Sequence, residues 1–297
     1  MNRRVRNLIF SFMPFVLLNV YQIIGSIVAS QIGVALYIHN YHGNDFATFV
    51  EGMTSGSTMT IINNGTYLIY CVIGLSTFGY YYYSHFYKKN HRRYDHSTVF
   101  TKAAEPNVSF RGYRPLWVIA GMAIAILGIS IVVNNVVEAL SVAFPEWLAE
   151  FEALEEAAGL TDINAIMLIY ACIFGPIVEE LGFRGICIEH LKRSTGFWGT
   201  CIIQAILFGA VHMNKMQASY AFLVGMLLGY VYLKTGNLVL TSMMHMIYNF
   251  CGGMVEYGME GIPQTPVITF VILVVGLGAS YYGAKILAKS KNRVKEN

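Results

Sequence analysis

The chain has 297 residues, of which 55% are hydrophobic and 12% charged, with a formal net charge of +3 and a mean hydropathy of +0.50. These values exclude an ordinary soluble globular domain and are typical of proteins that cross a membrane several times. We expect no nucleic-acid partner, because the basic residues follow membrane topology instead of forming one patch.

The first half of the chain contains three apolar segments long enough to span a membrane. The segment 8–38 follows three arginines and is longer than the apolar core of a cleavable signal peptide, so we expect a signal anchor. Segments at about 61–83 and 116–144 provide the next two spans. The loop 84–115 holds seven basic residues and is predicted to be cytoplasmic, whereas the acidic stretch 146–162 is predicted to form an amphipathic helix on the outer surface.

The second half predicts five further spans separated by short polar connections. They cover residues 163–191, 197–213, 218–233 and 238–254, and the last begins at Pro266. With both chain ends inside, this arrangement leaves Lys215 as the one basic residue on the outer side. We therefore predict an all-α polytopic membrane protein with about eight transmembrane helices and with its N-terminus and C-terminus cytoplasmic.

The span 163–191 contains two adjacent carboxylates and an arginine, Glu179, Glu180 and Arg184. Ionisable groups within a membrane cost several kcal/mol unless they are paired or line a wet cavity, so they are candidates for function. Helical spacing lets Glu180 and Arg184 pair on one face, while Glu179 is rotated by about 100° and stays the freer carboxylate. The alternative for the pair is a buried ion pair that only fixes packing, and for Glu179 an interhelical hydrogen bond.

Two other spans carry polar side chains at the same depth. Phe208 and His212 lie in one span, and His245 and Asn249 lie one helical turn apart in another. Counted from the cytoplasmic flanks at about 1.5 Å per residue, Glu179, the two histidines and the asparagine all lie about 16 to 23 Å deep. Because they share one level, we predict a single site. Taken alone, each group has a structural alternative as a satisfied core histidine or as an interhelical hydrogen bond.

In chain order these motifs are EExxxR, FxxxH and HxxxN, and over about 165–253 the sequence resembles the CPBP intramembrane protease family. That family includes CAAX prenyl proteases, bacteriocin-processing or immunity proteins and Abi-like proteins. The resemblance implies a catalytic base at Glu179, structural partners at Glu180 and Arg184, a water-positioning residue at His212, an oxyanion side at His245 and Asn249, and a packing role at Phe208.

The chemistry of a carboxylate beside two histidines is activation of water, which hydrolyses a peptide bond without a covalent intermediate. The resemblance leaves two mechanisms open, a metal-free glutamic one and a metal-dependent one. No cofactor is certain, but zinc is a possible one, with Glu179, His212 and His245 as its ligands. We favour the metal-free mechanism because no HExxH segment is present. The five cysteines have no CxxC spacing, and we interpret them as small buried hydrophobes.

The predicted function is that of an intramembrane endopeptidase of the CPBP type, acting on a membrane-associated peptide or protein and surrounded by membrane lipid. The alternative is a non-catalytic membrane protein of the same fold with an immunity, scaffold or transporter-like binding role. We predict a multi-pass protein of a bacterial cell membrane. The chain divides into an N-terminal part at 1–162, a catalytic core at 163–254, and a last helix with a basic tail at 255–297. The sequence does not indicate an oligomeric state or name the substrate.

Overall fold

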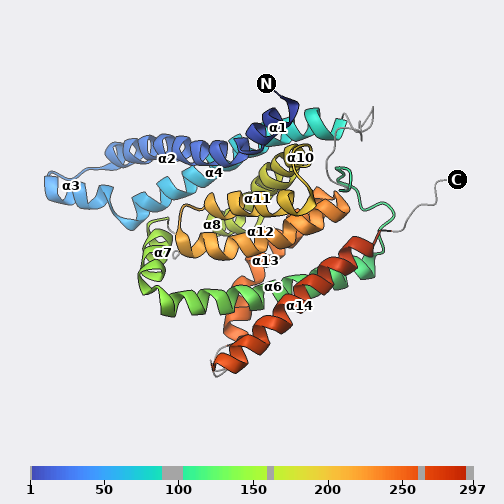
Figure 1. Cartoon of the computed structure of the whole chain (residues 1–297). Coiled ribbons are helices and arrows are strands. Elements are labelled where there is room, and N and C mark those ends of the chain that lie inside the picture. The colour runs from blue at the N-terminus through green and yellow to red at the C-terminus, as the bar shows by residue number, and fades with distance from the viewer. Residues whose placement is uncertain (1, 89–102, 159–163, 260–264, 292–297) are drawn as a thin grey trace.

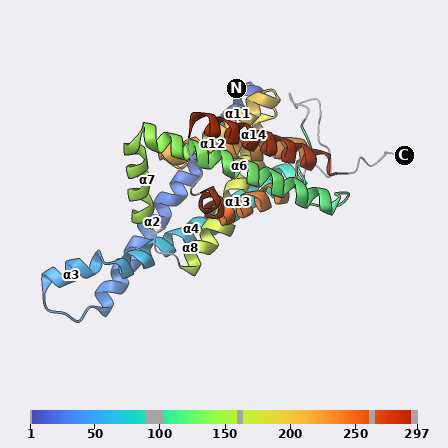
Figure 2. The same ribbon diagram turned by 90° about the horizontal axis from the view of Figure 1, so that it is seen from below.

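The structure is a computed structural model that describes residues 2–88, 103–158, 164–259 and 265–291, without the side chains of 252–259. The described residues form helices and two isolated β-bridges but no strand (Figures 1 and 2). An all-α fold is therefore confirmed. The first helices are α1 (Arg3–Ser11), α2 (Met13–Asn40), α3 (Phe46–Met53), α4 (Gly56–Tyr82), η1 (Tyr83–Tyr87), α6 (Pro115–Ala143) and α7 (Pro145–Ala157).

The second half begins with a composite helix that carries the EExxxR motif. Its pieces are α8 (Ala165–Ile169), η3 (Tyr170–Phe174), α9 (Gly175–Glu180), η4 (Leu181–Ile188) and α10 (Glu189–Leu191), where η marks a π-helical turn. We call these pieces together the motif helix. The remaining helices are α11 (Phe197–Ala210), α12 (Lys215–Thr235), α13 (Leu238–Met259) and α14 (Pro266–Lys289).

The apolar helices occupy the positions of all eight predicted spans. Within the described residues, six are long and apolar enough to cross a membrane: Arg3–Asn40, Phe46–Tyr87, Pro115–Ala143, Ala165–Leu191, Lys215–Thr235 and Pro266–Lys289. The other two, Phe197–Ala210 and Leu238–Cys251, are shorter. A helix of 14 residues such as α11 extends only about 21 Å, less than the roughly 30 Å of a hydrocarbon core. The polytopic fold is confirmed, with α11 too short to span alone, whereas the backbone of α13 continues to Met259 over 22 residues.

The turn after α11 explains why this helix ends earlier than predicted. Met213 adopts a left-handed conformation with φ of 56°, which breaks the helical hydrogen-bond ladder. Asn214 then caps α12, because its side-chain oxygen accepts a hydrogen bond from the Gln217 backbone N–H at 3.0 Å. The helix therefore ends at Ala210, three residues before the predicted end of this span at Met213.

One end of the bundle gathers the segments that we predict to be cytoplasmic (Figure 1). The Arg4 side chain donates a hydrogen bond to the Ser194 carbonyl, just after the motif helix. The segment 103–114 bonds through its backbone to the ends of α12 and α14, with the pairs Ala104–Leu233, Asn107–Gly236 and Arg114–Ser290. The sidedness of this end stays a prediction. The predicted basic residues in 89–102 and 292–297 lie outside the described residues, as does the part of the acidic stretch at 159–162.

A buried polar cluster fixes the motif helix at the same end. The Lys192 ammonium lies 2.6 Å from the Glu189 carboxylate and donates to the Ala104 carbonyl at 3.1 Å. The Tyr232 hydroxyl on α12 donates to the same carboxylate at 3.0 Å. Burial lowers the pKa of the Lys192 ammonium, while the negative charge of Glu189 acts in the opposite direction. The cluster therefore links the motif helix to α12 and to the segment 103–114.

The helices α6 and α14 pack side by side in both views (Figures 1 and 2). Glycines make this approach close: a Cβ at Gly128 would lie 2.4 Å from the Ser280 backbone nitrogen, and one at Gly283 would lie 2.4 Å from that of Ala125. Small residues that let backbones touch are the usual basis of helix association in membranes. In both views the α2–α3–α4 arm projects beyond the other helices at the opposite end from 103–114.

Candidate active site

The motif helix is irregular next to its carboxylates, and a proline explains the first irregularity. The N–H of Gly175 bonds to the carbonyl of Tyr170, five residues back, which is a π-helical turn. Pro176 has no N–H, so the carbonyl of Ala171 loses the donor that a continuing π pattern would supply. π-turns inside α-helices are frequent at functional sites. A backbone acceptor is thus freed about two turns before Glu179.

The amide of Asn249 satisfies this freed acceptor. Its side-chain nitrogen donates to the Ala171 carbonyl at 2.8 Å, which ties α13 to the motif helix. An open backbone carbonyl is costly in a membrane, where no water replaces the lost partner. The predicted site residue Asn249 is therefore placed beside the motif helix, but its amide is bonded to the backbone and not directed at the carboxylates.

The carboxylate of Glu180 forms the predicted ion pair with Arg184. One Glu180 oxygen lies 2.9 Å from Arg184 Nη1, and both side chains are completely buried. The guanidinium also lies 4.4 Å from the centre of the Phe208 ring, in a cation–π arrangement, and 3.5 Å from the Gly225 carbonyl on α12. Arg184 therefore connects the motif helix with α11 and α12.

His245 lies between the two adjacent carboxylates. Its Nδ1 is 3.1 Å from Glu180 Oε1, and its Nε2 is 3.7 Å from Glu179 Oε2. When Nδ1 donates to Glu180, a neutral imidazole carries its lone pair on Nε2, on the side of Glu179. The order Arg184, Glu180, His245, Glu179 thus forms one continuous polar chain.

Exposure differs along this polar chain. Glu180 and Arg184 are fully buried, His245 is 5% exposed, and the Glu179 side chain is 15% exposed. Glu179 is therefore the carboxylate of the pair that has access to the space outside the packed core. This agrees with the sequence-based expectation that Glu179 is the freer of the two.

Phe208 links both histidines to this cluster. Its ring packs edge to face against His212 and His245, with ring centres 5.7 and 5.6 Å apart. Phe208 is itself 2% exposed and also contacts Phe183 of the motif helix at 5.2 Å. His212 contacts the site through this ring. The sequence placed the three motifs at one depth in the membrane, and the structure shows that they are also in contact with one another.

Residues of α4 complete the surroundings of Glu179, and the sequence analysis missed them. A Cβ at Gly74 would lie 2.5 Å from Val178 Cγ1, so α4 packs closely against the motif helix beside Glu179. Tyr70 and Cys71 consequently lie near enough for the charge of Glu179 to act on them. A signal for Tyr70 existed, because tyrosines of membrane helices favour the interface and this one lies in the middle of an apolar segment.

Among the described residues, no group of three or more His, Cys, Asp or Glu side chains is arranged to hold a metal ion. Of the predicted zinc ligands, Glu179 and His245 lie 3.7 Å apart, whereas His212 contacts the Phe208 ring. All five cysteines are free thiols, and three of them are buried.

Comparison with known proteins gives two similarities. Residues 161–251 match the model of the family described as "Type II CAAX prenyl endopeptidase Rce1-like". The chain is also similar to the "Putative membrane peptidase YdiL" of Bacillus subtilis (strain 168), with 29% identity over 140 residues that cover 46% of this chain and 54% of that protein. The match thus spans about half the length of that relative. No solved structure matches the chain. The family match contains every motif residue discussed above.

Proposed function

Because the chain belongs to the CPBP family of membrane proteases, we propose that it is an intramembrane endopeptidase that cleaves a membrane-associated peptide or protein. The observation that carries the proposal is the pairing of Glu179 with His245 Nε2 at 3.7 Å, at the exposed end of a buried polar chain. Helix packing alone does not require the second carboxylate, Glu179, to be partly exposed beside the imidazole of His245.

We assign the hydrolytic water to the space in front of Glu179 and His245. Two hydrogen bonds of about 2.8 Å can meet at one water across a gap of this width. Glu179 takes a proton from the water as it attacks the peptide carbonyl, and the same carboxyl group then returns that proton to the leaving amine. No covalent bond between enzyme and substrate is needed, and atoms and charge balance over the cycle.

The distances favour a division of roles that differs from the one implied by the motifs. His245, rather than His212, is the imidazole beside Glu179, so we assign it to hold the water. Glu180 and Arg184 orient that imidazole from behind. His212 we assign as the donor toward the oxyanion, a contribution of about 3 to 4 kcal/mol per donor in other hydrolases. Asn249 we assign to positioning, because its amide is bonded to Ala171.

The substrate class follows from the membrane setting of the site. A multi-pass protein with its carboxylates on membrane helices meets substrates that are themselves in or on the bilayer. The matching family is described by its CAAX prenyl endopeptidases, and prenylated C-terminal peptides are therefore one substrate class to test. Leader peptides with an apolar segment are the second, in keeping with our prediction of a bacterial cell membrane.

The test uses the purified full chain in lipid vesicles with a panel of fluorogenic peptides, farnesylated CAAX peptides in one arm and apolar leader peptides in the other. We expect turnover in one arm and at least a hundredfold loss for Glu179→Gln. The matched control is Glu138→Gln, which removes another acid from a predicted span but lies outside the polar chain. Equal activity of the wild type and Glu179→Gln would overturn the proposal. A folded wild-type protein that cleaves neither the farnesylated peptides nor the leader peptides would favour the non-catalytic alternative.

A further inference from the structure

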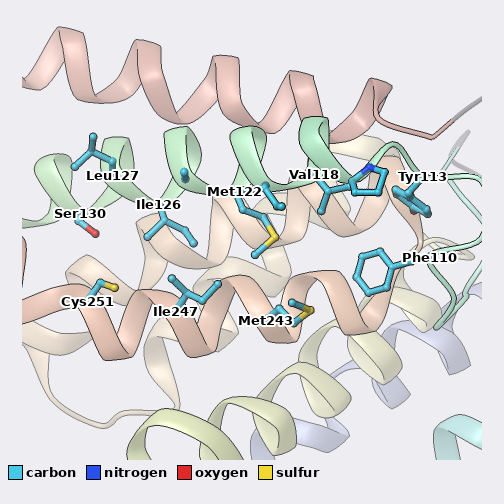
Figure 3. Close-up of a pocket in the computed structure, with 13 residues that line it drawn as sticks. Phe110, Tyr113, Val118, Met122, Ile126, Leu127, Ser130, Met243, Ile247 and Cys251 are labelled. Carbon is cyan, nitrogen blue, oxygen red and sulfur yellow. The ribbon is translucent and has the colours of Figure 1, made fainter.

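A second concave feature lies between α6 and α13, apart from the carboxylates (Figure 3). It is a cavity of about 710 Å³. Its walls are formed mainly by side chains of the two helices: Val118, Met122 and Ile126 from α6, and Met243, Ile247 and Cys251 from α13. Part of its lining is exposed, including Ile119 and Leu127 of α6 and Met243 of α13, so the cavity is open on one side. A large exposed apolar surface of this kind indicates a binding site.

The chemistry of the walls selects an apolar ligand. Aliphatic, aromatic and sulfur-containing side chains make up nearly all of the lining, and the Ser130 hydroxyl is buried there with no partner in the protein. A site for water or a polar peptide needs two to four polar partners, which these walls lack. An apolar chain suits them, because van der Waals contact between its methylenes and the apolar walls is the attraction that acts inside a membrane.

The length of the cavity matches one leaflet of a bilayer. On α6 the lining extends from Pro115 to Ser130, which corresponds to about 22 Å along the helix. Half of a bilayer, with its headgroup region included, is about 20 to 22 Å thick. Phe110 and Tyr113 form the end nearest the segments predicted to be cytoplasmic (Figure 3). The cavity therefore has the depth that one extended acyl chain of that leaflet requires.

The charge at this end favours an anionic headgroup. Arg111 is exposed and lies between the two aromatic residues that close the cavity, Phe110 and Tyr113. The Lys291 ammonium lies 5.7 Å from the centre of the Tyr113 ring. Glu105 is the acidic residue of the described segment 103–114, so positive charge predominates there. Basic residues at the membrane surface attract anionic lipids.

We propose that this cavity binds one acyl chain of an anionic phospholipid, whose headgroup lies at Arg111 and Lys291. The site is separate from the catalytic one, because α13 stands between them: Met243 and Ile247 face the cavity, whereas His245 contacts the carboxylates on the other side of the same helix. The inference does not rest on protease activity and is tested without a substrate.

The experiment uses the full chain in nanodiscs that contain a trace of phosphatidylglycerol with a photoreactive group near the end of one acyl chain. A parallel sample contains the phosphatidylcholine analogue with the same chain. After illumination, the crosslinked residues are mapped by mass spectrometry. We expect crosslinks on the cavity side of α6 and α13, at residues such as Met122 and Ile247, and a several-fold higher yield for the anionic lipid.

Three variants make the result specific. Ala123→Phe fills part of the cavity and displaces the chain from its walls, so we expect several-fold less crosslinking. Ala120→Phe places the same ring on the same helix at an exposed position outside the lining and leaves the yield unchanged. Arg111→Gln removes the preference for the anionic lipid but keeps the crosslinked positions.

Several outcomes would overturn the proposal. Crosslinks spread over exposed faces such as Val271 and Val275 of α14 would mean that the lipid is only annular. Equal yields for the two headgroups in the wild type would refute the anionic selectivity. An equal effect of Ala120→Phe and Ala123→Phe would show that disturbed folding, and not a filled cavity, lowers the yield.

Discussion

Replacing Arg184 with methionine leaves the Glu180 carboxylate buried without its guanidinium partner. The two groups are 2.9 Å apart and neither has any exposed surface. Loss of one partner of a buried pair costs about 3 to 5 kcal/mol, because the remaining charge is left uncompensated. His245 Nδ1, at 3.1 Å from the same carboxylate oxygen, provides partial compensation. We therefore expect the unfolding free energy to fall by about 3 kcal/mol, at the lower end of this range.

The assay is equilibrium unfolding in mixed micelles by titration with SDS, followed by far-UV circular dichroism. The exposed pair between Lys215 and Glu150, at 3.6 Å, supplies the control: Lys215→Met is expected to change the unfolding free energy by less than about 1 kcal/mol. The double variant Glu180→Gln with Arg184→Met removes both charges and is expected to be more stable than Arg184→Met alone. An Arg184→Met protein within about 1 kcal/mol of the wild type would refute the reasoning.

Three further predictions concern the contacts around this pair. Asn249→Ala removes the donor to the Ala171 carbonyl and should lower the unfolding free energy by about 0.6 kcal/mol, with about 1.7 as the upper limit; a loss of turnover beyond about a hundredfold with unchanged stability would instead assign the amide to the oxyanion. Gly74→Ala forces a Cβ against Val178 and should destabilise by about 1 to 3 kcal/mol, and Val178→Ala in the same chain should recover part of this, as measured by the same SDS titration. A chelator such as 1,10-phenanthroline is expected to leave peptide cleavage unchanged, and inhibition that added zinc reverses would contradict the metal-free assignment.

Hydropathy predicted the positions of the helices well because the membrane imposes a simple rule. Every backbone group within the hydrocarbon must be bonded internally, so an apolar segment of sufficient length becomes a helix. The rule does not say where a helix stops short. α11 ends at Ala210 because Met213 turns left-handed and Asn214 caps the next helix, and both events depend on local backbone geometry. Local backbone geometry, and not hydropathy, therefore sets the end of this helix.

Helical spacing also predicted the Glu180–Arg184 pair, since the four-residue spacing is a local property. The partner of Asn249 could not be predicted in this way. That contact requires a π-turn, a proline that withholds an N–H, and a second helix at the right height. The proline is visible in the sequence, but the π-turn and the contact appear only in the fold, which brings together two residues 78 positions apart in the chain. The same holds for Tyr70, which comes from a helix with no motif at all.

The two adjacent carboxylates explain why an imidazole is needed at position 245. The side chains of neighbouring helical residues point about 100° apart. A single side chain that contacts both carboxylates therefore needs polar atoms on two of its sides, as an imidazole ring has. His245 does this with Nδ1 toward Glu180 and Nε2 toward Glu179. With Glu180 and Arg184 balancing each other, the cluster is neutral when Glu179 and His245 share one proton. A neutral cluster is the arrangement that a membrane interior favours.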